Sequence, residues 1–281
     1  MVAIFDITDP GDSRVDDFRD LNSADRRPDL PTGKGLVIAE GVLVARRMLA
    51  SRFSAHAFLG TDRRLSELGR DMPGDLGGQD IPFYRATAEV MAEVVGFHLN
   101  RGLLAAARRP AELRVPDVLA GCRTVAVLEG VNDHENLGSM FRNAAGLGID
   151  GVLFGTGCAD PLYRRAVRVS MGHALLVPFA RARQWPADLQ LLRDDDFVLL
   201  AMTPDPEADA LADVMGGLAG RKVAILVGAE GPGLTETVMR ASDVRVRIPM
   251  SRGTDSLNVA TAAALAFYER VRQAGRAGPI I

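Results

Sequence analysis

Short apolar runs alternate with amphipathic segments along the first third of the chain. Apolar residues recur at helical spacing from about Ile38 onward, and further helical patterns cover residues 62–72 and 87–96. Two short apolar runs, at residues 55–60 and 81–86, are typical of strands. This alternation predicts a compact α/β unit of about 80 residues.

The second half of the chain has a stronger pattern. Six apolar runs are rich in Val, Leu and Ile, as expected of parallel strands that are covered on both faces. Helical segments lie between most of them. We therefore predict an open, mostly parallel sheet with helices on both sides. The predicted strands are residues 124–129, 151–155, 175–180, 197–202, 222–228 and 244–250.

A boundary between two domains is predicted from Arg108 to Pro116, where two prolines accompany a cluster of charges. The first domain then covers residues 34–114 and the second covers residues 120–281. Residues 1–33 are polar and contain several Asp, Pro and Gly. We expect this stretch to be a poorly ordered or surface-draped arm.

Composition narrows the class of protein. The hydrophobic content of 47% and the charged content of 25% are ordinary for a soluble globular chain of 281 residues. The acidic N-terminus argues against a signal peptide, and no apolar stretch approaches the length of a membrane span. We expect a cytoplasmic protein that has no membrane partner and keeps Cys122 and Cys158 as reduced thiols.

The net charge of −3 does not favour a nucleic-acid-binding protein, but the charge is distributed unevenly. Local basic segments can bind phosphates while the acidic N-terminus balances the sum. The alternative is that these arginines only form solvated faces. The arginines concerned are Arg101, Arg108, Arg109 and Arg114 in one segment, and Arg164, Arg165, Arg168, Arg181 and Arg183 in another.

Three segments with glycine follow predicted strands, where ligands of open α/β sheets bind. In the first, at residues 128–150, Asn136 is a candidate cap for the following helix. Arg142 lies one turn from Gly138 and Ser139, and an arginine beside small residues suits a phosphate or a ribose. The alternative interpretation is an ordinary exposed helix arginine.

The second segment, at residues 225–234, has three glycines within six residues, so its backbone can approach a ligand closely. It lacks the Gly-Lys-Ser/Thr of a P-loop, and Glu230 occupies the second glycine position of the dinucleotide fingerprint. Glu230 is a candidate acceptor of hydrogen bonds from a ligand or the loop, or else an ordinary exposed acid.

The third segment, at residues 248–269, contains an alanine-rich helical pattern. Ser256 is a candidate N-cap for this helix. Asn258, placed in its first turn, offers both a donor and an acceptor. The alternative is a capped helix with only a structural role.

The order and spacing of these segments resemble the SpoU (TrmH-like) family of RNA 2′-O-ribose methyltransferases, of the SPOUT superfamily. The resemblance covers roughly residues 120–275 and includes all three family motifs, and residues 167–179 are similar to the segment between the first two. Residues 37–49 and 95–109 resemble the family's substrate-binding domain, which is similar to a ribosomal protein. There the family's more common His-Gln-Gly pattern appears as His-Leu-Asn-Arg-Gly.

The resemblance implies a C-terminal α/β domain with a trefoil knot and a homodimer with each site near the subunit interface. It also implies S-adenosyl-L-methionine as the methyl donor and structured RNA as the partner, with rRNA favoured over tRNA and no DNA. The implied catalytic residues are Asn136, Arg142, Glu230, Ser256 and Asn258. The implied cofactor-binding residues are Thr203, Gly228, Glu230, Gly231, Ile248, Met250, Leu257 and Asn258.

Three other functions are alternatives to this one. A tRNA ribose methyltransferase would carry the same motifs, and a noncatalytic RNA-binding protein would bind RNA without the cofactor. A nicotinamide-dependent oxidoreductase is disfavoured by the missing dinucleotide fingerprint. We expect no metal site, because His56, His98, His134 and His173 show no ligand spacing with the two cysteines.

Overall fold

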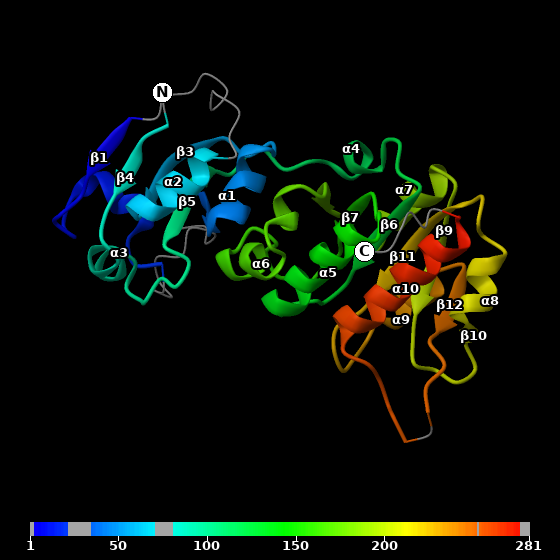
Figure 1. The fold of residues 1–281 in the computed structure, drawn as a ribbon. Helices are drawn as coiled ribbons and strands as arrows, with labels where there is room; N and C mark the ends of the chain where they lie inside the picture. The colour runs from blue at the N-terminus through cyan, green and yellow to red at the C-terminus, as the bar shows by residue number, and fades with distance from the viewer. Residues whose placement is uncertain (1–2, 22–34, 71–80, 252, 276–281) are drawn as a thin grey trace. The chain divides into compact units, whose positions relative to one another are not determined.

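The computed structural model describes residues 3–21, 35–70, 81–251 and 253–275, which form two compact units (Figure 1). The first unit combines Met1–Ala111 with Asp160–Leu176, and the second combines Glu112–Ala159 with Val177–Ile281. Among the helices in the described ranges, none has the length and apolar character needed to cross a membrane.

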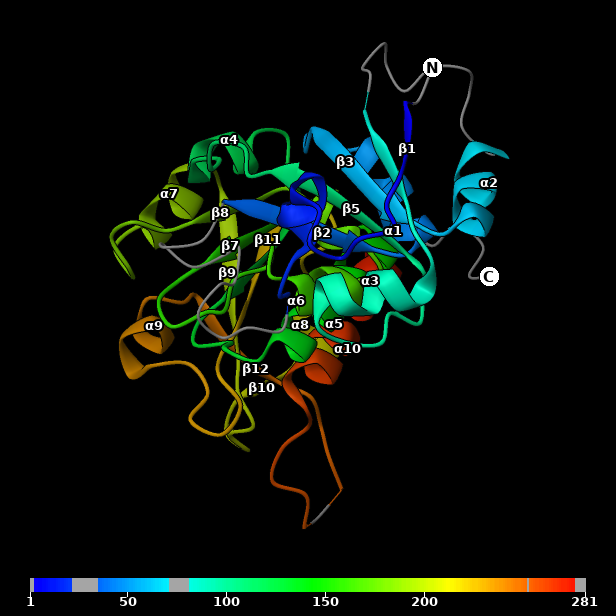
Figure 2. The same cartoon turned by 90° about the vertical axis from the view of Figure 1, so that its left-hand side faces the viewer.

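The first unit contains a mixed five-stranded sheet in the order β1-β4-β3-β5-β2. Strand β1 pairs in parallel with β4 at one edge (Figure 1), and β5 pairs antiparallel with both β3 and β2 (Figure 2). The strands are β1 (Ile4–Asp6), β2 (Leu36–Glu40), β3 (Ala55–Gly60), β4 (Phe83–Arg85) and β5 (Leu103–Arg108). The helices are η1 (Ser13–Phe18), α1 (Val42–Leu49), α2 (Asp62–Arg70) and α3 (Ala88–Val95), together with α6 (Arg164–Val169) and η2 (His173–Leu175).

The helical pattern predicted from Ile38 onward is wrong for its first residues, which form strand β2. All five residues of β2 are buried, so the run is apolar throughout and does not show the alternation of a half-buried strand. Helix α1 begins only after Gly41, which has a φ of 92°. Residues with a Cβ atom rarely adopt this φ, so glycine is needed at this turn.

The N-terminal stretch is not a loose arm over its described residues. Strand β1 belongs to the sheet, and Val15 and Phe18 of η1 are fully buried in the core of the first unit. Ile7 and Leu21 join the same core. These apolar residues are interspersed among aspartates. The overall composition is therefore polar and indicates an arm, although the apolar side chains themselves are buried in the core. Residues 1–2 and 22–33 of the predicted arm lie outside the described residues.

The segment with α6 packs in the first unit, although it falls within the range predicted for the second domain. Arg164 forms an ion pair with Glu40 at 3.0 Å, with side chains only 16% and 5% exposed. Its guanidinium also lies 4.5 Å from the centre of the Phe97 ring. The ion pair supplies the charge that the buried Glu40 carboxylate requires.

The second unit is built on a fully parallel seven-stranded sheet in the order β10-β12-β9-β11-β6-β7-β8, which confirms the predicted α/β class. The strand predicted at residues 175–180 begins only at Phe179, because Pro178 has no N–H for the ladder and Leu175 ends η2. The strands are β6 (Thr124–Leu128), β7 (Gly151–Phe154), β8 (Phe179–Arg181), β9 (Phe197–Met202), β10 (Asp209–Ala210), β11 (Lys222–Val227) and β12 (Val244–Arg247).

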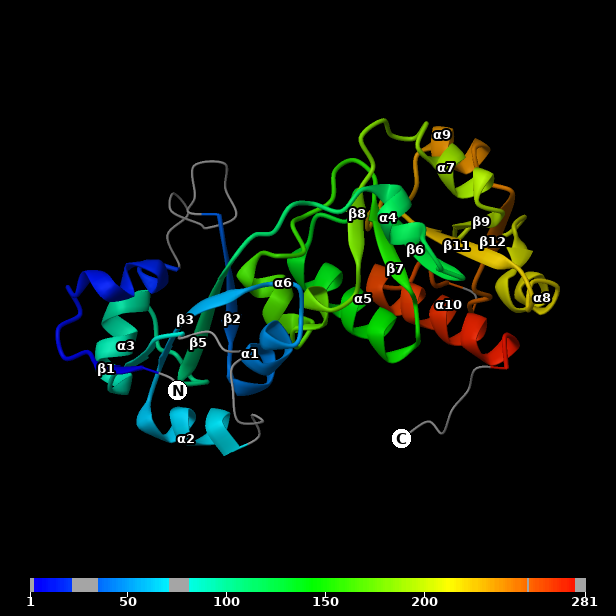
Figure 3. The same ribbon diagram turned by 90° about the horizontal axis from the view of Figure 1, so that it is seen from above.

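Helices cover both faces of this sheet (Figure 3). Apolar residues of α4, α7 and α9 form one core with alternate side chains of the central strands, such as Val125 and Val127. On the opposite face α10 packs against α5 and α8. The trefoil knot implied by the resemblance stays a prediction. The helices are α4 (Val115–Leu119), α5 (His134–Gly146), α7 (Leu189–Asp194), α8 (Leu211–Gly216), α9 (Glu236–Arg240) and α10 (Val259–Gln273).

Helix α10 is anchored by the buried side chain of Arg270, which is 3% exposed. Its guanidinium donates to the Thr124 hydroxyl at 3.0 Å and to the carbonyl oxygens of Leu218 and Arg221 at 2.7 and 2.6 Å. One side chain thus joins the last helix to the start of β6 and to the loop before β11.

We expect Arg270→Ala to lower the free energy of unfolding of the second unit by about 3 kcal/mol, because buried oxygen acceptors lose a charged donor. Urea unfolding followed by fluorescence measures this change, since the single tryptophan, Trp185, lies in this unit. The control is Arg272→Ala, which removes a half-exposed i,i+3 pair with Glu269 and should change stability by less than about 0.5 kcal/mol. Equal losses in the two variants would contradict the anchoring role.

Both cysteines are free thiols, as predicted. Cys122 is buried and donates from Sγ to the Val118 carbonyl oxygen at 2.8 Å, and burial raises the pKa of its thiol to about 11. Burial also raises the pKa of the Cys158 thiol. Both groups are therefore protonated at neutral pH in the folded protein.

Alkylation of Cys122 by iodoacetamide at pH 8 should be at least roughly 100-fold slower in the folded than in the urea-unfolded protein, because the raised pKa depletes the reactive thiolate. The folded rate should keep rising between pH 8 and 10, while the unfolded rate levels off near the pKa of a free thiol. Peptide mass spectrometry measures both rates, and a similar rate in the two states would show that the thiol is accessible and ionised.

Candidate active site

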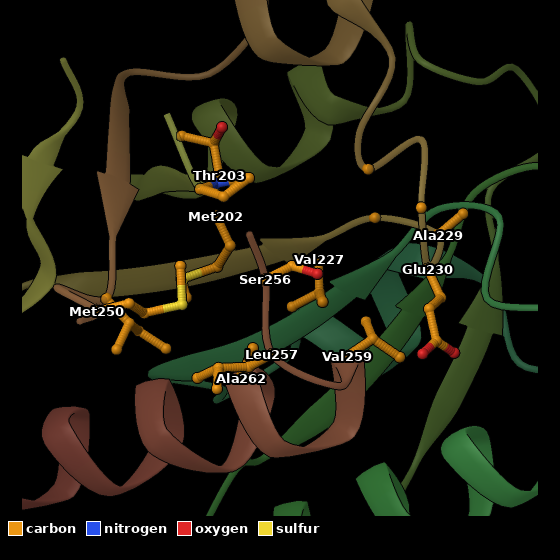
Figure 4. Close-up of a pocket in the computed structure, with 15 residues that line it drawn as sticks. Met202, Thr203, Val227, Ala229, Glu230, Met250, Ser256, Leu257, Val259 and Ala262 are labelled. Atoms are coloured by element: carbon orange, nitrogen blue, oxygen red, sulfur yellow. The ribbon is translucent and has the colours of Figure 1, made fainter. Parts of the chain in front are cut away.

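A pocket lies at the carboxyl ends of the parallel strands β9, β11 and β12. Its empty volume is about 690 Å³, including the open solvent at its mouth. In Figure 4, Met202 and Met250 lie together at one end and Glu230 lies at the other. The lining residues are Met202–Pro204, Val227–Gly231, Gly233, Ile248, Met250, Ser256, Leu257, Val259 and Ala262.

The glycine-rich turn after β11 forms one wall of this pocket. Two backbone hydrogen bonds close it, from Ala229 N to Gly233 O at 3.2 Å and from Gly233 N to Ala229 O at 2.9 Å. A Cβ atom on Gly228 would lie 2.1 Å from backbone atoms of Gly233 and Leu234. Only glycine fits at position 228, because the turn folds back directly onto it.

Three predicted site residues form a hydrogen-bonded chain. The Asn258 amide donates from Nδ2 to Asn136 Oδ1 at 2.8 Å, and Asn136 Nδ2 donates to Glu230 Oε2 at 3.1 Å. Asn258 Oδ1 accepts from the backbone N–H groups of Ala260 and Thr261. That engagement fixes the Asn258 amide orientation, so every donor in the chain points toward the Glu230 carboxylate.

The capping residues differ from those predicted. Helix α5 is capped by Asp133, whose carboxylate accepts from the backbone N–H groups of Glu135 and Asn136. Asn136 therefore lies inside the first turn, where its side chain is free of capping and reaches Glu230. Helix α10 is capped by Asn258 and not by Ser256. In both helices the observed start differs by a few residues from the predicted one, which changes the positions of Asn136 and Asn258 relative to the N-cap.

The remaining predicted catalytic residues are placed differently. Ser256 is exposed and lines the pocket. Arg142 is exposed on α5 and does not line the pocket, and within the described part of the chain it forms no hydrogen bond or ion pair. Seven of the eight predicted cofactor-binding residues line the pocket, namely Thr203, Gly228, Glu230, Gly231, Ile248, Met250 and Leu257, whereas Asn258 joins the adjacent hydrogen-bonded chain.

Several arginines considered for phosphate binding are engaged within the protein. Arg164 pairs with buried Glu40, and Arg109 pairs with Asp160 at 2.5 Å with both side chains about one quarter exposed. Arg181 donates to the Ala159 carbonyl oxygen and packs its guanidinium 5.2 Å from the centre of the Phe154 ring. Charge counting along the sequence does not reveal these internal partners.

Sequence reasoning missed Glu129, at the carboxyl end of β6. Its side chain is 5% exposed and accepts hydrogen bonds from Trp185 and from Thr235, the residue that ends the glycine-rich turn. The signal that could have found it was an acidic residue directly after an apolar strand and directly before a glycine. Among the described residues, no group of three or more His, Cys, Asp or Glu side chains is placed to hold a metal ion.

The model of the SpoU rRNA methylase family matches residues 123–268, just over half of the chain. The chain belongs to this family. A tRNA/rRNA methyltransferase of Mycobacterium tuberculosis, itself uncharacterised, is 69% identical over 274 residues, which are 98% of this chain and 94% of the relative. The protein is therefore an RNA methyltransferase of the SpoU type, as the motif order predicted.

Two further relatives bear on the SpoU domain and on the whole fold. A 23S rRNA (guanosine-2′-O-)-methyltransferase of Bordetella pertussis is 35% identical over 159 residues, covering 57% of this chain and 63% of the relative. The AdoMet-bound rRNA methyltransferase from Sinorhizobium meliloti has a TM-score of 0.78, covering 96% of this chain and 98% of that chain at 20% identity. The second likeness shows that the two proteins share a fold.

The double role of Asn258 in this SpoU protein can be separated by substitution. Asn258→Asp keeps the oxygen that caps α10 but removes the donor to Asn136, whereas Asn258→Ala removes both. We expect methyl transfer to fall at least tenfold in both variants. Only the alanine variant should lose stability, by about 1 kcal/mol.

Urea unfolding and a methyl-transfer assay on the same preparations measure these two effects. An aspartate variant with wild-type activity would contradict a need for the amide donor.

Proposed function

We propose that the protein transfers a methyl group from S-adenosylmethionine to a ribose 2′-hydroxyl of RNA, with ribosomal RNA as the preferred substrate. The observation that carries the proposal is the hydrogen-bonded chain from Asn258 through Asn136 to Glu230 beside the pocket. These hydrogen bonds connect one residue from each of the three glycine-containing segments. The 2′-O assignment is also supported by the name of the Bordetella pertussis relative.

The pocket residues fit S-adenosylmethionine. Apolar side chains, including Met202, Ile248 and Leu257, suit an adenine ring, and the turn at Gly228 brings backbone groups close to the pocket. The Glu230 carboxylate places a negative charge at one end, which favours a bound cation such as a sulfonium. When bound, the cofactor supplies an activated methyl group, so the protein must position the ribose hydroxyl and assist loss of its proton.

Arg142 is assigned to the RNA. A guanidinium is effectively always protonated in proteins, so it acts poorly as a base. Its exposure on α5 leaves the planar fork open to bind the phosphate next to the target ribose. The same charge stabilises the oxyanion that develops on the 2′-oxygen. The first unit is assigned to recognition of the RNA fold, by analogy with the family's substrate-binding domain.

The proposal includes a cytoplasmic homodimer. Leu265 and Tyr268 lie one helical turn apart on α10 and are 41% and 43% exposed. Such an apolar patch on the last helix of the second unit suits contact with a second copy.

The test is transfer of labelled methyl from S-adenosylmethionine to unmodified ribosomal RNA and to transfer RNA. We expect label in ribosomal RNA, at one alkali-resistant ribose linkage. Arg142→Ala should lower the rate at least about 100-fold, and Arg142→Lys about tenfold, because lysine keeps the charge without the fork. Arg240→Ala, which removes an exposed i,i+4 pair with Glu236 on α9, is the matched control and should act like wild type.

Each other outcome has a distinct meaning. Near wild-type turnover of Arg142→Lys would contradict the bidentate contact. Label only in transfer RNA would correct the substrate. If the protein bound RNA but not S-adenosylmethionine, the result would contradict the enzymatic function and favour a noncatalytic RNA-binding protein.

A further inference from the structure

A buried carboxylate outside the pocket, that of Glu129, is held entirely by neutral donors. It accepts from Trp185 Nε1 at 2.7 Å, and from the Thr235 backbone N–H and hydroxyl at 2.7 and 3.0 Å. Within the described part of the chain, Glu129 forms no ion pair. A buried carboxylate needs such hydrogen bonds, so these donors and Glu129 fix one another's positions.

One of the two donor residues is itself held firmly. The Trp185 indole packs on Gly155 so closely that a Cβ atom there would lie 2.4 Å from the ring. Gly155 directly follows β7, and Trp185 follows β8. The tryptophan N–H is thus presented to Glu129 from a rigid position between two strand ends.

The other donor residue, Thr235, ends the glycine-rich turn. Its hydroxyl oxygen accepts from the Val238 backbone N–H at 3.4 Å as the cap of α9, which leaves the hydroxyl hydrogen for Glu129. The turn begins where β11 ends, and the Glu129 N–H donates to the Val227 carbonyl oxygen at 3.0 Å. Glu129 therefore contacts the chain on both sides of the turn.

The turn held in this way lines the pocket and carries Glu230. We propose that Glu129 is a positioning residue, which fixes the glycine-rich turn and thereby sets the affinity for S-adenosylmethionine without contacting it. This inference rests on the proposed function. It predicts an effect on cofactor binding, and a much smaller effect on turnover once the cofactor is bound.

Glu129→Gln tests the proposal, because the amide group of glutamine is a donor and would oppose an N–H of Trp185 or Thr235. We expect the dissociation constant for S-adenosylhomocysteine, measured by calorimetry well below the melting temperature, to rise at least tenfold. Hydrogen exchange of the backbone amides at residues 229–235 should become faster. The KM for S-adenosylmethionine should rise with the dissociation constant, while kcat changes less than threefold.

Substitutions of Thr235 provide a matched pair. Thr235→Ser keeps the hydroxyl and should retain near wild-type affinity for S-adenosylhomocysteine. Thr235→Val should weaken this binding as Glu129→Gln does. Combining Thr235→Val with Glu129→Gln should add little to the larger single effect, because both remove the same contact.

The control is Glu40→Gln, which alters a glutamate of equal burial in the first unit, 4% exposed against 5% for Glu129. It should lower thermal stability and leave the affinity for S-adenosylhomocysteine unchanged. Wild-type affinity in Glu129→Gln would overturn the positioning role. Failure of the wild type itself to bind S-adenosylhomocysteine would overturn the proposed function instead, and hydrogen exchange would then still show whether Glu129 holds the turn.

Discussion

The polar end of the pocket depends on one constraint, the backbone N–H groups that have no helical partner at the start of α10. They occupy the oxygen of Asn258 and so fix which way its amide points. Asn136 must then present its oxygen to Asn258 and its nitrogen to Glu230. A helix terminus thus fixes the orientation of three side chains from three separate segments, and Glu230 at the end of the series accepts a hydrogen bond.

Beyond the hydrogen bonds from Asn258 through Asn136 to Glu230, buried polar groups at the ends of the strands stabilise the second unit. Arg270 joins the base of β6 to α10 through oxygen acceptors, and Glu129 joins the opposite end of β6 to the glycine-rich turn through neutral donors. The Glu129 carboxylate forms no ion pair among the described residues, and the Arg270 guanidinium donates to three oxygen atoms of the protein. Hydrogen bonds with defined geometry hold them, which favours a single arrangement of the loops between the strands.

The apolar runs of the sequence predicted the parallel sheet and placed the three glycine-containing segments after strands, where ligands bind. The resemblance to the SpoU family then implied that Asn136, Glu230 and Asn258 belong to one site. The apolar pattern did not predict β2, since a run buried on both faces has no period to read. The helix starts were also misplaced, because several neighbouring residues can cap and only the backbone decides among them. The contacts of Glu129 join residues 56 and 106 positions apart, which no local pattern contains.

The pairing of Glu40 with Arg164 spans 124 positions of the chain. During synthesis, β2 and its acidic end emerge long before α6, and most of the strands of the second unit's sheet are still to be made when α6 appears. The first unit therefore cannot complete its core until the chain has entered and left the second one. The folding of the first unit thus finishes only after part of the second unit has been synthesised. Until α6 emerges from the ribosome, Glu40 lacks its ion-pair partner Arg164.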